Sequence, residues 1–282
     1  MTNMIAINDF GGNAGATVWW NLRGNVPAQA LRDAWSRHGL TIALPDLPSP
    51  EKKLGRAVET VKDAHTFTRP LARSGKWAIV HEEMAGDVLL HSHSLSVWVT
   101  PGKTTPEYTD WTPITQRVQE AFDAQDGIYH RDDLSLWLAD VVKRLHGTRM
   151  RERGAPYYLL PVHVETWKRM NAALGEAGAG LLYTLPTLPS AEAEAAILNA
   201  LSNDVQAETE DFLAKLEGQG ARALRNRVAD LDGTLARLEA YESLLGGALE
   251  GVRKRVLDTQ DQVIAAAFAA EAKALAEQAA KK

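Results

Sequence analysis

The sequence has 282 residues, of which 45% are hydrophobic and 24% are charged, a composition typical of a folded protein and not of a disordered one. Its formal net charge of -5 argues against binding to nucleic acid through the overall electrostatic field. It contains no cysteine, which excludes disulfides, thiolate nucleophiles and cysteine-based zinc or iron–sulfur sites and fits a cytosolic protein.

The first seven residues carry no basic side chain and lead into Asn8 and Asp9, which is unlike a secretory signal peptide. No apolar run approaches the roughly 18 residues that a membrane-spanning helix needs. The sequence therefore predicts a soluble protein in the cytoplasm.

The N-terminal part predicts a strand followed by two helices. Residues 16–22 are rich in β-branched and aromatic side chains, which favour a strand. Apolar residues recur at helical spacing over 28–38, and again after Ser49, which is placed to cap a helix that begins with Pro50. Each of these helices is therefore expected to bury one face.

Between residues 67 and 108 the spacing of apolar residues changes to two, as in half-buried strands. Three strands and a short edge strand are predicted there, over 66–72, 76–83, 87–100 and 107–109. Because the junctions between the three strands are short and contain glycine, we expect an antiparallel meander.

Two further helices are predicted over 112–125 and 131–146. A strand–helix–strand unit follows, over 155–160, 163–175 and 180–185. Short connections in such a unit favour a parallel pair of strands joined by a right-handed crossover.

The last third of the chain is predicted to be entirely helical. Residues 190–282 contain no proline, and two helical runs over 190–217 and 221–279 are separated by two glycines. Glycines at such a junction suit a turn between antiparallel helices. Gly246, Gly247 and Gly251 weaken the second run, so a bend or a close helix crossing is expected there.

The predicted fold class is α+β. A head domain over residues 1–188 would contain a mixed, mostly antiparallel sheet. An arm over residues 189–282 would form a long helical hairpin or coiled coil. An extended amphipathic arm must bury its apolar stripe against a partner, so we expect its side chains to form a partner interface: Leu224, Val228, Leu231, Leu235, Leu238, Leu245, Leu249, Val252 and Val256.

A pair of histidines, His91 and His93, suggests a metal site. Residues two apart on a strand share a face, so both imidazoles could hold one ion. The pattern is similar to that of cupins and of zinc-dependent isopeptidases, although the further ligands of those families do not stand here. The alternative is that both imidazoles share a sheet face with Leu89, Leu95 and Val97, partly buried and hydrogen-bonded.

A basic cluster lies between the helix over 131–146 and the following strand. Its members could contact the phosphates of nucleic acid, and they are Lys143, Arg144, Arg149, Arg151 and Arg153. Cations at the end of a helix are also favoured by the helix dipole, and Glu152 would neutralise part of their charge. The cluster is therefore either a phosphate-binding surface or an ordinary solvated face.

Other chemistry finds little support. No Gly-x-Ser-x-Gly elbow occurs, and the adjacent pairs Glu82-Glu83 and Asp132-Asp133 lack the spacing of an acid–base site. The balance favours a protein without enzymatic activity, and no cofactor is expected.

One stretch resembles a known family. Residues 134–161, with Arg149-Met150-Arg151-Glu152-Arg153-Gly154 leading into Ala155-Pro156-Tyr157-Tyr158-Leu159-Leu160-Pro161, resemble a segment of an uncharacterised family of bacteria and their phages. Residues 48–56 and 241–246 are also similar to it. The resemblance implies a prokaryotic or phage origin and no particular activity.

Three functions remain as expectations. The first is a structural or adaptor protein that self-associates or docks on a protein partner through the C-terminal helices. The second is a nucleic-acid-associated protein that uses the basic cluster. The third is a metal-dependent hydrolase that uses His91 and His93.

Overall fold

A computed structural model describes residues 15–71, 75–85, 88–151, 154, 156–216 and 219–280. Contacts within the chain divide it into two compact units. The first unit contains residues 1–21, 138–172 and 181–282, and the second contains residues 22–137 and 173–180. The units therefore do not divide at residue 188, where the sequence predicted the end of a head domain.

The second unit contains the predicted meander, which is confirmed. Its sheet has the order β3-β4-β5-β6, and the three neighbouring pairs are antiparallel. The strands are β3 (Thr66–Pro70), β4 (Lys76–Ala85), β5 (Val88–Trp98) and β6 (Glu107–Tyr108). A short pair of strands, β2 (Val26–Pro27) and β7 (Ile128–Tyr129), belongs to the same unit.

Two helices cover one face of the meander, α2 (Pro50–Glu59) and α3 (Pro113–Asp123). Ser49 caps α2 by accepting a hydrogen bond from the backbone N–H of Lys52, and proline follows at the first helical position, as the sequence predicts. The shared apolar cluster includes Leu54 of α2, Phe122 of α3 and Ile79 of β4, all at most 2% exposed. Helix α1 (Ala28–Arg37) buries its own apolar face in the same unit.

The first unit is built on a second sheet, of order β10-β1-β9-β8. Its strands are β1 (Ala16–Leu22), β8 (Thr148–Arg149), β9 (Tyr157–Leu159) and β10 (Gly180–Pro186). Trp20 of β1 stacks on Tyr157 with ring centroids 5.4 Å apart, and its ring lies 6.1 Å from Trp167 of α5 (Pro161–Glu176). This aromatic group packs α5 against the sheet.

The strands of the predicted strand–helix–strand unit are not hydrogen-bonded neighbours, because β1 lies between β9 and β10. β1 runs antiparallel to β9. The backbone N–H of Thr187 donates to Gly15, just beyond one end of β10, and that of Arg23 donates to Ala179 beyond the other. These two bonds make β10 antiparallel to β1 as well. β9 and β10 therefore run parallel to each other, each antiparallel to β1 between them, and α5 connects β9 to β10.

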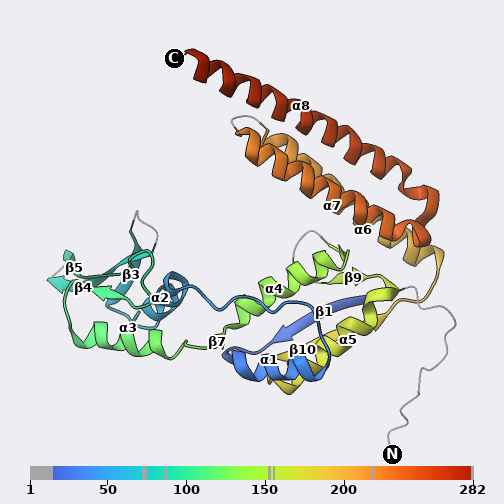
Figure 1. Ribbon diagram of the computed structural model, residues 1–282. Coiled ribbons are helices and arrows are strands. Elements are labelled where there is room, and N and C mark those ends of the chain that lie inside the picture. Colours follow the sequence, from blue (N-terminus) through green and yellow to red (C-terminus); the bar gives the residue numbers. More distant parts are fainter. Residues whose placement is uncertain are drawn as a thin grey trace, which may run out of the picture. The chain divides into compact units, whose positions relative to one another are not determined.

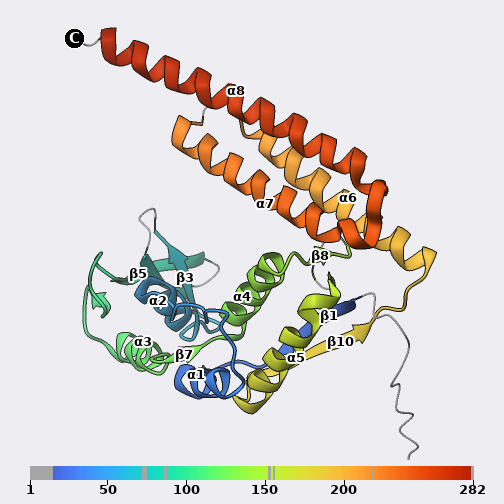
Figure 2. The same ribbon diagram turned by 45° about the vertical axis from the view of Figure 1, so that its right-hand side comes forward.

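The C-terminal third forms three helices, α6 (Ala191–Ala214), α7 (Ala221–Leu245) and α8 (Glu250–Ala280). The second predicted helical run is thus two helices, separated by a 3₁₀ turn over Gly246–Leu249. Gly246 has a φ of 53°, outside the helical range, so the chain reverses where the sequence predicted a bend. Figures 1 and 2 show α6, α7 and α8 lying side by side.

The three C-terminal helices share one apolar cluster with the second sheet. Tyr158 and Leu160, from β9 and the residue after it, belong to the same cluster as Leu231 of α7 and Val256 of α8. The helices therefore do not form a separate arm, and this shared cluster explains why they belong to the same unit as β1 and β9. None of the described helices is long and apolar enough to cross a membrane.

Candidate functional site

The predicted partner interface is occupied by the chain itself. Leu224, Leu231, Leu238, Leu249, Val252 and Val256 are buried in the shared cluster, and Val228, Leu235 and Leu245 are partly buried against it. Because α8 folds back along α7 and α6 packs on both, each helix covers the apolar stripe of the others. Six of these side chains are therefore core residues, and the three partly buried ones leave only a minor part of their surface exposed.

A different apolar stripe is exposed on α8. Leu257, Phe268 and Leu275 are 44%, 68% and 67% exposed, and Ile264 between them is half-buried. Steps of seven, four and seven residues place the four side chains on one face of the helix. We call these four residues the outer α8 face.

A groove of about 490 Å³ adjoins this face between α7 and α8. Val228 and Ala229 line it from α7, and Ile264, Ala267 and Phe268 line it from α8. Two polar pairs stand on its rim: the guanidinium of Arg225 lies 2.7 Å from Glu271, and Gln260 donates to Asp232 at 2.6 Å. The outer α8 face thus combines a protruding ring with an apolar recess.

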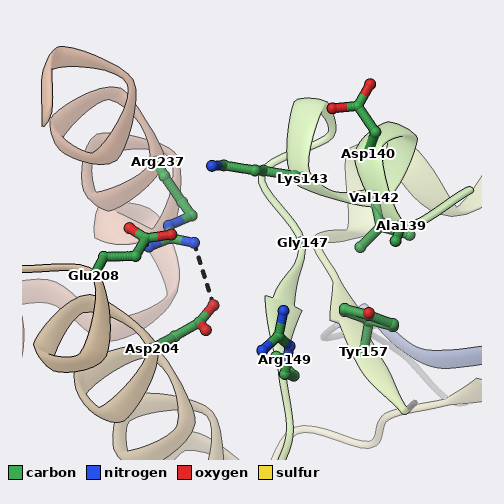
Figure 3. A pocket seen from close by; sticks show the side chains of 10 residues that line it. All are labelled: Ala139, Asp140, Val142, Lys143, Gly147, Arg149, Tyr157, Asp204, Glu208 and Arg237. Atoms are coloured by element: carbon green, nitrogen blue, oxygen red, sulfur yellow. Dashed lines mark hydrogen bonds and ion pairs between the residues drawn. The ribbon is translucent and has the colours of Figure 1, made fainter. Parts of the chain in front are cut away.

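A charged recess of about 270 Å³ lies elsewhere in the first unit, between α4 (Arg131–Arg144), β8, β9, α6 and α7 (Figure 3). At its floor Arg237 is only 4% exposed. Its Nη1 lies 3.3 Å from Asp204 and its Nη2 lies 2.9 Å from Glu208. Glu208 also accepts a hydrogen bond from Thr234 at 3.1 Å, so this network fastens α6 to α7.

Two members of the predicted basic cluster line this recess, Lys143 and Arg149. Figure 3 shows the side chain of Lys143 extending towards Arg237. Arg144 pairs instead with Asp140 at 3.0 Å. Arg151 is exposed, and Arg153 lies outside the described residues.

The charges of the recess nearly balance. Lys143, Arg149 and Arg237 face three carboxylates, those of Asp140, Asp204 and Glu208. Because its charges nearly cancel, such a lining does not create the positive electrostatic potential that attracts a nucleic acid to a surface. In the described part of the chain, however, neither the Lys143 ammonium nor Nε of Arg237 has a hydrogen-bond or ion-pair partner.

Of the predicted metal site, the structure describes only the side chain of His91. Nδ1 of His91 lies 3.3 Å from Glu82, while the side chain of His93 lies outside the described residues. Among the described residues, no group of three or more histidines and carboxylates is placed to hold an ion.

The alternative, that His91 shares a sheet face with Leu95, is wrong. Leu95 pairs with Ile79 and His91 pairs with Glu82, three residues further along β4, because the register shifts between Ile79 and Val80. Residues three apart on a strand point to opposite faces. His91 is therefore exposed on the face opposite Leu95, whose side packs on α2 and α3.

Comparison with known proteins identifies the family. Residues 14–280 match the sequence model of a family described as "Family of unknown function (DUF6744)". The chain belongs to this family. The match spans both units and confirms the resemblance to an uncharacterised family. No curated protein and no solved structure gives a significant match to the chain.

In this DUF6744 chain, two phenols of the shared cluster stay protonated near neutral pH. Burial raises the pKa of Tyr158 to about 12. Burial also raises the pKa of Tyr241, whose ring centroid lies 6.0 Å from that of Tyr158. Both rings therefore pack against each other as neutral groups where β9 meets α7. Among the described residues, the charged recess and the outer α8 face are two surfaces that could serve a function of this DUF6744 chain.

Proposed function

We propose that the chain is a non-catalytic structural protein that self-associates through the outer α8 face. The observation that carries the proposal is the exposure of Leu257, Phe268 and Leu275 along one line of a long helix. Large apolar side chains scattered singly are normal on a protein surface, whereas aligned ones mark an interaction site. The helix that carries them is one of those to which the sequence assigns association, and of the nine residues predicted there, Val228 lines the groove beside this face.

A second copy supplies the chemistry that this surface needs. A cyclic dimer uses the same patch on both subunits, so the patch must contain both a protruding group and a recess. Phe268 protrudes, and the groove beside it is lined by Val228, Ile264 and Ala267. Aromatic side chains that enter apolar recesses are typical centres of protein–protein interfaces.

Light scattering coupled to size exclusion tests the proposal on the full chain. The unaltered protein is expected to be dimeric at micromolar concentration, and Phe268→Asp is expected to be monomeric. Val162→Asp is a matched control, because Val162 is 74% exposed on α5, away from the outer α8 face, and an acidic residue suits the first turn of a helix. A monomeric unaltered protein at ~100 µM, or a Phe268→Asp variant as dimeric as the control, would overturn the proposal.

A second candidate function is binding of nucleic-acid phosphates by Lys143, Arg149 and Arg151. It is favoured by the Lys143 ammonium, which has no ion-pair partner among the described residues. A gel-shift series over increasing salt would test it, since each phosphate contact steepens the salt dependence. Absence of any shift at low salt, or an equal shift with Lys143→Gln, would remove this candidate.

A further inference from the structure

We infer that the two copies pair their α8 helices antiparallel, about a two-fold axis at the level of residue 266. This inference rests on the proposed self-association and specifies its geometry. The intervals between Leu257, Ile264, Phe268 and Leu275 read the same in both directions. In an antiparallel pair, each of these residues therefore lies opposite an apolar residue of the partner subunit. Leu257 lies opposite Leu275 of the partner subunit, and Ile264 lies opposite the partner's Phe268.

The groove lies at the centre of this arrangement. Its α8 lining, Ile264, Ala267 and Phe268, brackets the level of residue 266. The exposed ring of Phe268 from each copy then meets the other copy's groove beside Ile264. Each subunit contributes one ring and one recess, as a closed two-fold interface requires.

The antiparallel orientation also brings opposite charges of the groove rim to one level. Arg225 lies beside Glu271, on one side of the residue 266 level, and Asp232 lies beside Gln260, at a similar distance on the other side. Antiparallel pairing brings Arg225, together with its own partner Glu271, to the level of Asp232 of the partner subunit. Parallel pairing would instead set the two protruding Phe268 rings against each other and bring Asp232 to the level of the partner's Asp232. Opposite charges across an interface fix its register, and like charges oppose it.

Single cysteines test the orientation, because the natural chain has none. Leu257→Cys and Leu275→Cys are prepared separately, checked for dimerisation under reducing conditions, and then oxidised alone and as a mixture. The two positions lie about 27 Å apart along one helix, whereas a disulfide needs Cα atoms within about 7 Å. We expect a covalent dimer in the mixture only.

Each other outcome is informative. Covalent dimers from each variant alone would show parallel pairing, and they would overturn this inference while leaving self-association intact. Dimers by light scattering that cross-link in no combination would show that the helices meet elsewhere, which also overturns it. If Leu257→Cys and Leu275→Cys are monomeric under reducing conditions while the unaltered protein is dimeric, Ile264→Cys and Phe268→Cys are oxidised as a mixture at higher protein concentration instead. A failure of these two variants to cross-link would also overturn the inference. A monomeric unaltered protein would instead remove the proposed function itself.

A charge variant checks the register independently. Arg225→Gln should weaken dimerisation about two- to five-fold, as expected for a partly exposed ion pair across an interface. Arg253→Gln is the matched control, since Arg253 makes a similar exposed pair with Glu242 between α8 and α7 at 2.6 Å, beyond the apolar stripe. Equal dissociation constants for both variants would contradict the predicted contact with the partner's Asp232.

Discussion

Single buried charges fasten helices to one another in both units. In the second unit, Asp133 accepts hydrogen bonds from Arg56 at 2.7 and 2.8 Å and from the backbone N–H of His130 at 3.0 Å, and Lys52 lies 2.6 Å away. Burial would raise the pKa of Asp133, but these donors outweigh it and lower the pKa to about 2. The carboxylate therefore joins α2 to the first turn of α4.

The low pKa of Asp133 predicts a loss of stability in acid. Because the folded-state pKa lies below the ordinary value of 3.8, the stabilisation is present above pH 4 and is lost as the pH falls towards 2. Its size is about 2 kcal/mol. Asp133→Asn should lower the free energy of unfolding by about that amount at pH 7 and flatten the profile between pH 4 and 2. Urea denaturation at several pH values measures both effects, and an unchanged profile would contradict this account.

Arg237 has the same role in the first unit, where its guanidinium pairs with Asp204 and Glu208. Arg237→Met should reduce the free energy of unfolding by about 2–3 kcal/mol, because it leaves two partly buried carboxylates without their cation. Arg144→Gln, which removes the exposed pair of Arg144 with Asp140, should cost less than about 1 kcal/mol. Chemical denaturation of the two variants compares them, and equal losses would show that the Arg237 network contributes little.

At the scale of elements, the reversal between α7 and α8 depends on one glycine. Gly246 has φ 53° and ψ −137°, a conformation that side chains rarely adopt. A methyl group added there would meet no atom within 4 Å. Any cost of substitution is therefore conformational and not steric.

Gly246 and Gly247 form a matched pair for this argument. Gly246→Ala should destabilise the protein by about 1–3 kcal/mol, and it should favour continuation of α7 into α8. Gly247→Ala should be neutral or slightly stabilising, since its φ is not left-handed and its surroundings are also open. Thermal unfolding compares the two, and an equal effect would show that the φ of Gly246 is not what determines the turn.

The elements differ in how well the sequence predicts them. The meander followed directly from the two-residue period and the short glycine-containing junctions, because hairpin pairing is local. The pairing of β9 with β1 joins residues such as Leu159 and Ala16, and no local pattern indicates that contact. The sequence also does not predict the bulge beside Val80. One extra residue leaves the sequence pattern unchanged but turns His91 to the other face of the sheet.

At the scale of the whole molecule, self-association predicts a concentration-dependent melting temperature. Only a dimer gains stability by mass action, so the melting temperature of the unaltered protein should rise between ~1 and ~100 µM. That of Phe268→Asp should stay constant, and Val162→Asp should follow the unaltered protein. Scanning calorimetry or fluorimetry measures this directly, and three parallel curves would speak against association through the outer α8 face.

The sequence by itself determined the α+β class, the meander, the helical C-terminal third and membership of an uncharacterised family, because periodicity, turn residues and family motifs are local properties of the chain. Only the tertiary structure decided which apolar stripe is covered: Leu231 and Val256 are buried in the core, whereas Phe268 is exposed. The reason is that both stripes have the same helical spacing, and the reversal at Gly246 determines which of them meets another helix.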